Sequence, residues 1–179
     1  IMTQLVEPTP PELSKISTAL EVELASLGFD WIDATSLMTG KDFLDKIWKI
    51  ILGVPLGIAI VTPDMSQKTI ANIFYELGIM DALGKETLII KSKSYKIPSD
   101  FKRTEYLNYD TTFKSRFKQF GENLLKREQH YWLMSEILEA DPVLSIDYIK
   151  RAYLLNPKIR YKKEAEKIFY QNNHAIDKQ

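Results

Sequence analysis

Short apolar runs alternate with amphipathic helical segments along the first two thirds of the chain. Uninterrupted apolar runs cover residues 57–61 and 87–90, and a further candidate lies at residues 1–6. A strand without polar alternation is typical of a parallel sheet that is covered by helices on both faces. Because helical segments separate these runs up to residue 127, the order is βαβα. The sequence therefore predicts an α/β domain built on a doubly wound parallel sheet.

Two weaker strands and four helices complete the predicted domain. The weaker strands, residues 29–33 and 106–109, are expected towards the edges of the sheet. The first helix opens at Pro10-Pro11 and stops at Gly28, residue types that favour the start and the end of a helix. The predicted helices cover residues 10–27, 41–52, 69–83 and 112–124.

The remainder of the chain, residues 128–179, contains no strand candidate and is predicted to be a helical extension. Its helices are expected at residues 131–140, 145–155 and 161–170, with breaks at Asp141-Pro142 and Asn156-Pro157. Residues 146–157 resemble the second half of a tetratricopeptide-type repeat, although such repeats stack stably only in sets of about three. The alternative is a helical tail that packs on the domain or on a second subunit.

Composition excludes several classes of protein. The 24 basic and 24 acidic side chains balance, which argues against a dedicated nucleic-acid or membrane-surface binder. Without cysteine, and with only His130 and His174, a thiolate nucleophile, a Ser-His-Asp triad and a histidine-centred metal site are not expected. No apolar run approaches the roughly 20 residues of a membrane span, and residues 1–6 do not look like a signal peptide. A cytoplasmic protein is expected.

The segment of residues 71–84 is the strongest candidate for chemistry. It is apolar nearly all the way round, so the helix is expected to be buried on most sides. Glu76 nevertheless lies in its middle, with Asn72 one turn earlier on the same face. An unpaired carboxylate is costly to bury, by several kcal/mol even after relaxation. Glu76 is therefore either paired with a lysine or backbone amides, or it faces a cleft in which it works.

A motif favours the second interpretation. Residues 72–78 read Asn-Ile-Phe-Tyr-Glu-Leu-Gly, and Gly84-Lys85 precedes the strand at 87–90. This pattern resembles the nucleoside 2-deoxyribosyltransferase-like proteins and their TIR-like relatives, which cleave nucleotides such as NAD. The segment of residues 98–103 and Tyr109-Asp110 is similar to the family's proline-containing segment before its last strand. The resemblance covers residues 1 to 125 and implies a flavodoxin-like doubly wound sheet.

The resemblance implies an N-glycosidase or a deoxyribosyltransferase that uses no cofactor. Glu76 would then act on the anomeric carbon of a nucleoside or nucleotide, where positive charge develops as the bond to the base breaks. Family sites are often completed by a neighbouring subunit, so a homo-oligomer is expected. The other candidate site residues are Asp33, Asp64, Asn72, Tyr75 and Asp100.

Each of these residues also has a structural interpretation. Asp33 and Asp100 are candidates for a general acid or for holding ribose hydroxyls, and both equally suit turns or helix caps. Asn72 could orient Glu76 or cap its helix, and Tyr75 could form a cleft wall or core. Since ligands of open α/β sheets bind at the carboxyl ends of the strands, the site is expected there. The alternative function is a catalytically inactive nucleotide-sensing or oligomerising scaffold.

Overall fold

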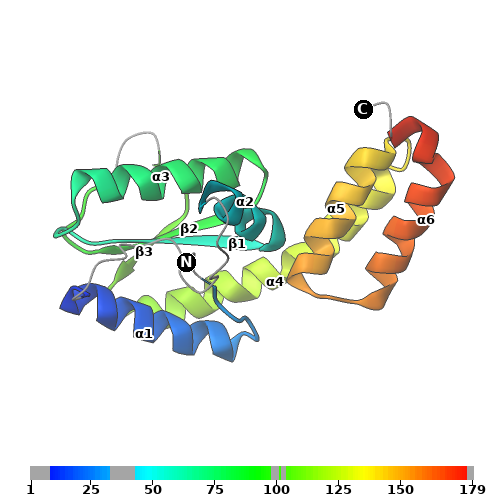
Figure 1. Ribbon diagram of the computed structural model, residues 1–179. Coiled ribbons are helices and arrows are strands. Elements are labelled where there is room, and N and C mark those ends of the chain that lie inside the picture. Colours follow the sequence, from blue (N-terminus) through cyan, green and yellow to red (C-terminus); the bar gives the residue numbers. More distant parts are fainter. Residues whose placement is uncertain (1–8, 33–42, 98–100, 102–103, 177–179) are drawn as a thin grey trace. The chain divides into compact units, whose positions relative to one another are not determined.

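A computed structural model describes residues 9–32, 43–97, 101 and 104–176, with the backbone alone for residues 43–46 and 173–176. The chain divides into two compact units, Ile1–Gln119 and Phe120–Gln179. Each unit has its own buried side chains. In Figure 1 the strands belong to the first unit, and α5 and α6 belong to the second. Within the described residues, no helix is both long and apolar enough to cross a membrane.

The first unit is built on a three-stranded parallel sheet in the order β1-β2-β3. The strands are β1 (Leu56–Val61), β2 (Glu86–Ser92) and β3 (Tyr106–Tyr109). In register, Ile58 pairs with Leu88, and Ile90 pairs with Leu107. Successive residues of β1 and β2 are buried whichever face they point to, because helices cover both faces. Figure 1 shows α3 on one face and α1 with the start of α4 on the other.

The described strands confirm an α/β domain with a parallel sheet, and the apolar runs at residues 57–61 and 87–90 are its central pair. The weaker prediction at residues 106–109 is also correct. The predicted strand at residues 1–6 lies outside the described residues. The predicted strand at residues 29–33 is wrong for the part that is described, since residues 29–32 are coil. They pair with no described strand, and Asp30 and Trp31 remain exposed.

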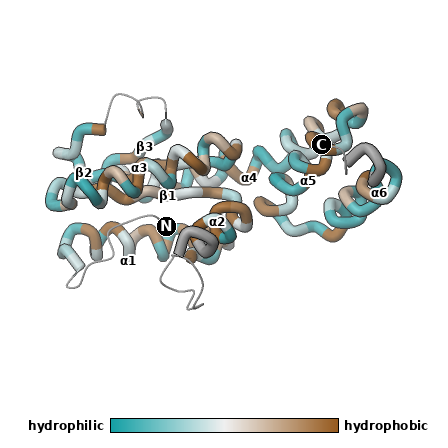
Figure 2. The backbone as a smooth tube through the Cα atoms, turned by 45° about the horizontal axis from the view of Figure 1, so that its top comes forward, coloured by the Kyte–Doolittle hydropathy of each residue, from teal (hydrophilic) through white to brown (hydrophobic). Residues whose placement is uncertain are grey.

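The helices of this unit begin and end near residue types that favour helix starts and helix ends. Helix α1 (Pro11–Ser26) has proline at its start and stops before Gly28, whose φ of +79° suits glycine. Brown and teal residues alternate along it in Figure 2, as expected of a helix that buries one stripe. Helix α2 (Phe43–Gly53) matches the predicted segment. Helix α3 (Gln67–Ala82) begins two residues before the prediction, because the hydroxyl of Ser66 caps the amide of Thr69.

The second unit consists of the later part of α4 (Phe113–Ile137) with α5 (Pro142–Leu155) and α6 (Ile159–Ile176). Two separate helices were predicted where α4 is continuous, since no proline interrupts residues 113–137. The break at Asp141-Pro142 is confirmed, and the Asp141 carboxylate caps α5 through the amide of Leu144 at 3.0 Å. The two compact units meet inside α4, after Gln119, whereas the sequence suggested a division after residue 127.

Candidate functional site

Glu76 lies on α3 beside the stripe that packs on the sheet. That stripe consists of Ile73, Phe74, Leu77 and Met80, all buried. Their spacing of one, three and three residues keeps them on the side of the helix that faces the strands. Glu76 stands next to this stripe and is half-buried, neither in the core nor in open solvent. The apolar pattern of α3 therefore fixes the carboxylate at the border of the core.

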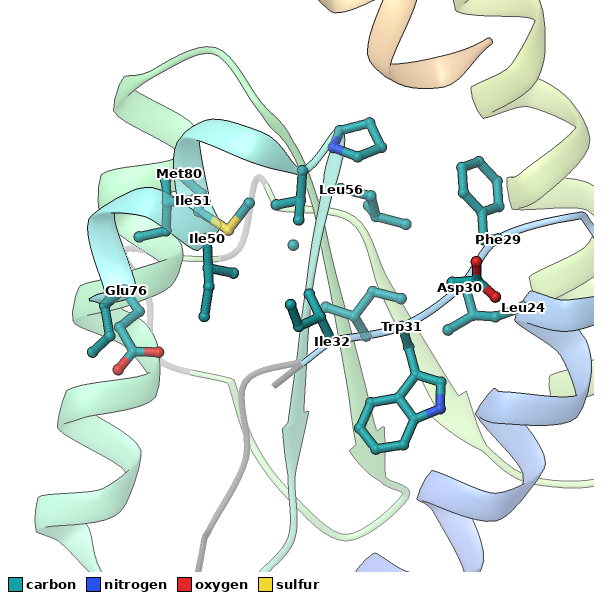
Figure 3. Close-up of a pocket in the computed structure, with 15 residues that line it drawn as sticks. Leu24, Phe29, Asp30, Trp31, Ile32, Ile50, Ile51, Leu56, Glu76 and Met80 are labelled. Atoms are coloured by element: carbon teal, nitrogen blue, oxygen red, sulfur yellow. The ribbon is translucent and has the colours of Figure 1, made fainter. Parts of the chain in front are cut away.

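A cavity of about 110 Å³ opens beside Glu76 (Figure 3). Four segments of the first unit line it: the end of α1 with the coil behind it, the end of α2 with its following loop, the first half of β1, and α3. The described lining residues are Leu24, Phe29, Asp30, Trp31, Ile32, Ile47, Ile50, Ile51, Val54, Pro55, Leu56, Gly57, Ile58, Glu76 and Met80.

The described side chains of the cavity wall are largely apolar apart from two carboxyl groups. Among the described lining residues, only Glu76 and Asp30 carry ionisable side chains. Figure 3 shows Glu76 on one side of the cavity, with Asp30 and the indole of Trp31 on the other. Trp31 keeps 44% of its surface exposed, which leaves its ring free to contact a ligand at the cavity mouth. The site thus offers apolar walls, the aromatic ring of Trp31 and the negative charges of Glu76 and Asp30.

The surroundings of Glu76 change its acidity. Removal of water by the neighbouring apolar groups raises the pKa of the Glu76 carboxyl above the 4.5 of an ordinary glutamate. Among the described residues, no side chain or amide donates a hydrogen bond to this carboxyl. The described part of the chain thus leaves the hydrogen-bonding capacity of this carboxylate unused.

Three of the other predicted site residues, Asp64, Asn72 and Tyr75, are described and do not line the cavity. Asn72 and Tyr75 are exposed on α3, Tyr75 by 68%, and neither lines the cavity. Asp64 is exposed in the loop between β1 and α3. Asp33 and Asp100 lie outside the described residues. Of the four predicted residues that the structure describes, only Glu76 lines the cavity.

The position of the cavity also differs from the expectation. It was predicted at the carboxyl ends of the strands, but the cavity is lined by Leu56, Gly57 and Ile58 at the amino end of β1. The carboxyl ends of β1 and β2 instead hold the buried polar side chains of Thr62, Lys91 and Ser92. Among the described strands, β1 pairs only with β2.

Sequence reasoning missed Asp30 and Trp31 as cavity residues. Both were assigned to a predicted strand, in which their side chains would point to opposite faces of the sheet. The available signal was Gly28, because a glycine in the left-handed conformation commonly ends a helix and changes the direction of the chain after it.

In the described part of the chain, no group of three or more His, Asp or Glu side chains is placed to hold a metal ion. Searches with family models, against curated proteins and against solved structures give no significant match. Function must therefore be inferred from the chemistry of the cavity.

Proposed function

We propose that the chain is an N-glycosidase or deoxyribosyltransferase-like enzyme that cleaves the bond between sugar and base in a nucleoside or nucleotide. The observation that carries the proposal is the Glu76 carboxylate, half-buried at an apolar cavity and without a hydrogen-bond donor among the described residues. The motif around Glu76, residues 72–78, supports the same activity. The helices on both faces of the parallel sheet are consistent with a flavodoxin-like doubly wound fold.

The proposed chemistry divides the cavity between the two halves of the substrate. A flat base is apolar on both faces, so it suits the aliphatic walls and the exposed ring of Trp31. The sugar would then lie towards Glu76. As the bond to the base lengthens, positive charge develops at the anomeric carbon, and a carboxylate at about 3 Å stabilises it or bonds to it covalently.

The raised pKa of Glu76 suits this role. Burial destabilises the ionised carboxylate, and a positively charged transition state restores the lost stabilisation. Glu76 therefore interacts more strongly with the transition state than with an uncharged ground state, which is the condition for catalysis. Hydrolysis and transfer share this first step and differ in whether water or a second base receives the sugar.

A second candidate function is a catalytically inactive nucleotide sensor or oligomerising scaffold. It is favoured by the positions of Asn72, Tyr75 and Asp64, which lie away from the cavity. In this alternative the cavity binds a ligand without cleaving it. The helical second unit would then provide contacts between copies of the chain.

Base release distinguishes the two functions. We expect the wild-type protein, incubated with NAD and a panel of nucleosides and nucleotides, to release free base that chromatography detects. Glu76→Gln should lower the rate by about a thousandfold or more while ligand affinity is retained, since the amide cannot stabilise the developing cation. Asp81→Asn is the matched control, because Asp81 is an exposed acid on the same helix outside the cavity lining.

If the folded protein releases base from none of these substrates, the proposed enzymatic activity is excluded. Ligand binding without base release would favour the sensor.

A further inference from the structure

The charge of the cavity restricts the substrates that can enter it. The described lining residues include two carboxyl groups, those of Glu76 and Asp30, and no lysine, arginine or histidine. Phosphate groups in protein sites are bound by such cations or by amides at helix N-termini. Glu76 and Met80 belong to the middle and the end of α3, so the amides at its N-terminus are elsewhere. The described part of the wall thus offers a phosphate group two carboxylates and no cationic side chain.

The same charges favour a cation. Two carboxylates in the described lining attract a positive group. The apolar surroundings of the half-buried Glu76 strengthen its attraction, whereas Asp30 is exposed and acts through solvent. Trp31 adds an exposed indole face, which also attracts cationic rings. A flat heterocycle with a positive charge on its glycosidic nitrogen matches all of these groups.

We infer that the cavity selects phosphate-free nucleosides, foremost those whose base is a cationic heterocycle, over nucleotides such as NAD. This inference rests on the proposed function, because it names the substrate class of the same site. It follows from the opposed carboxyl groups, the aliphatic walls and the indole of Trp31.

The reaction of such a nucleoside balances with the groups present. The bond between the anomeric carbon and the ring nitrogen breaks, and its electron pair goes to the nitrogen. The base becomes neutral and leaves without a proton, so no general acid is required. The positive charge moves to the sugar beside Glu76. Water then bonds to the anomeric carbon and releases one proton to solvent.

Calorimetric titration of the full chain with matched pairs tests the inference. The probes are N-ribosyl nicotinamide, uridine and the 5′-phosphate of each. We expect affinity to fall in the order cationic nucleoside, neutral nucleoside, nucleotide, with a loss of about tenfold or more on addition of the phosphate. Tighter or equal binding of the 5′-phosphates would overturn the inference.

A second test of the inference reverses the charge of Asp30 at the cavity mouth. Asp30 is exposed in coil, so Asp30→Lys should fold, and circular dichroism verifies this. We expect the variant to bind the 5′-phosphates more tightly and the cationic nucleoside more weakly than the wild type. Asp81→Lys changes the net charge equally but lies outside the lining, and should leave the order of affinities unchanged. An equal response in both variants would contradict a local effect.

The titration separates this inference from the proposed function. If the protein releases base but prefers nucleotides, the inference fails and the enzyme stands. If nucleosides bind in the expected order without base release, the proposed function fails and the ligand class stands. If none of the probes binds, both are overturned.

Discussion

Two glutamates at the border of a core, Glu76 in the first unit and Glu128 in the second, have opposite surroundings. Glu76 is half-buried at a cavity, and no described group donates a hydrogen bond to its carboxyl. Glu128 is 6% exposed and is held by several partners. The comparison shows that the burial of an acid does not by itself identify a working residue.

The partners of Glu128 come from the turn before α6 and from its first residues. Lys158 forms an ion pair with Glu128 at 2.8 Å, and the guanidinium of Arg160 lies 3.7 Å from the same oxygen. The hydroxyl of the fully buried Tyr161 also donates to this carboxylate. The amide of Asn156 approaches its other oxygen at 3.5 Å. These contacts of Glu128 therefore hold the start of α6 against α4 within the second unit.

The difference lies in the groups that satisfy each carboxylate. In the second unit, protein groups replace the water that Glu128 loses on folding, so its charge contributes to the packing of three helices. In the first unit, the described residues leave the carboxylate of Glu76 facing a cavity. A ligand would supply the missing partner, which is why we propose a functional role for Glu76 and a structural one for Glu128.

The largest effect on folding stability is expected when Glu128 is replaced. Glu128→Gln keeps the volume but removes the charge, so we expect the second unit to lose roughly 1 to 3 kcal/mol of its free energy of unfolding. The partial exposure of Lys158 and Arg160 keeps the loss below that of a fully buried pair. Urea unfolding, followed by the fluorescence of Trp132 after Trp31 and Trp48 are replaced by Phe, measures it.

The control for this variant is Glu122→Gln, an exposed acid on the same helix. It should change the stability by less than about 0.5 kcal/mol. An equal loss in both variants would show that Glu128 has no special structural role.

A smaller effect of opposite sign is expected at Glu76. Because burial raises the pKa of Glu76 in the folded protein above 4.5, the folded chain holds this proton at a higher pH than the unfolded chain does. Ionisation therefore costs stability above the folded pKa, and the cost disappears as the pH falls through it. Glu76→Gln should raise the free energy of unfolding at pH 7 by less than about 1 kcal/mol, since solvent screens a half-buried group.

Urea unfolding of the wild type and of Glu76→Gln, at pH 7 and again near pH 4, tests whether the substitution raises the free energy of unfolding. The advantage of Glu76→Gln should shrink as the pH falls. A loss of stability at pH 7 as large as that of Glu128→Gln would mean that Glu76 is also a structural acid, and the distinction between the two residues would be lost.

The sequence predicted the elements whose local pattern is strong. Uninterrupted apolar runs identify β1 and β2, and Gly28 and Asp141-Pro142 mark helix ends whatever the rest of the chain does. Residues 29–32 could not be assigned in this way. Whether such a short segment becomes a strand depends on a neighbouring backbone that only the tertiary structure supplies.

The candidate site was predicted only in its central residue. An acid in an apolar helix is visible in the sequence, so residues 71–84 alone point to Glu76 as the candidate. The cavity wall comes from α1, α2 and β1, whose contributions depend on how these elements pack. Asp30 and Trp31 escaped prediction for that reason, and so did the position of the cavity at the amino end of β1.

The central claim, that the carboxylate of Glu76 faces a ligand across the cavity, is tested most directly by the ionisation of this side chain. Carbon-13 NMR of the glutamate carboxyl groups, with Glu76→Gln to assign the signal, measures its pKa with and without N-ribosyl nicotinamide. We predict a pKa above 4.5 in the free protein that falls when the cation binds, because the cation stabilises the carboxylate. A pKa at or below 4.5, or one that the bound ligand leaves unchanged, would contradict this claim.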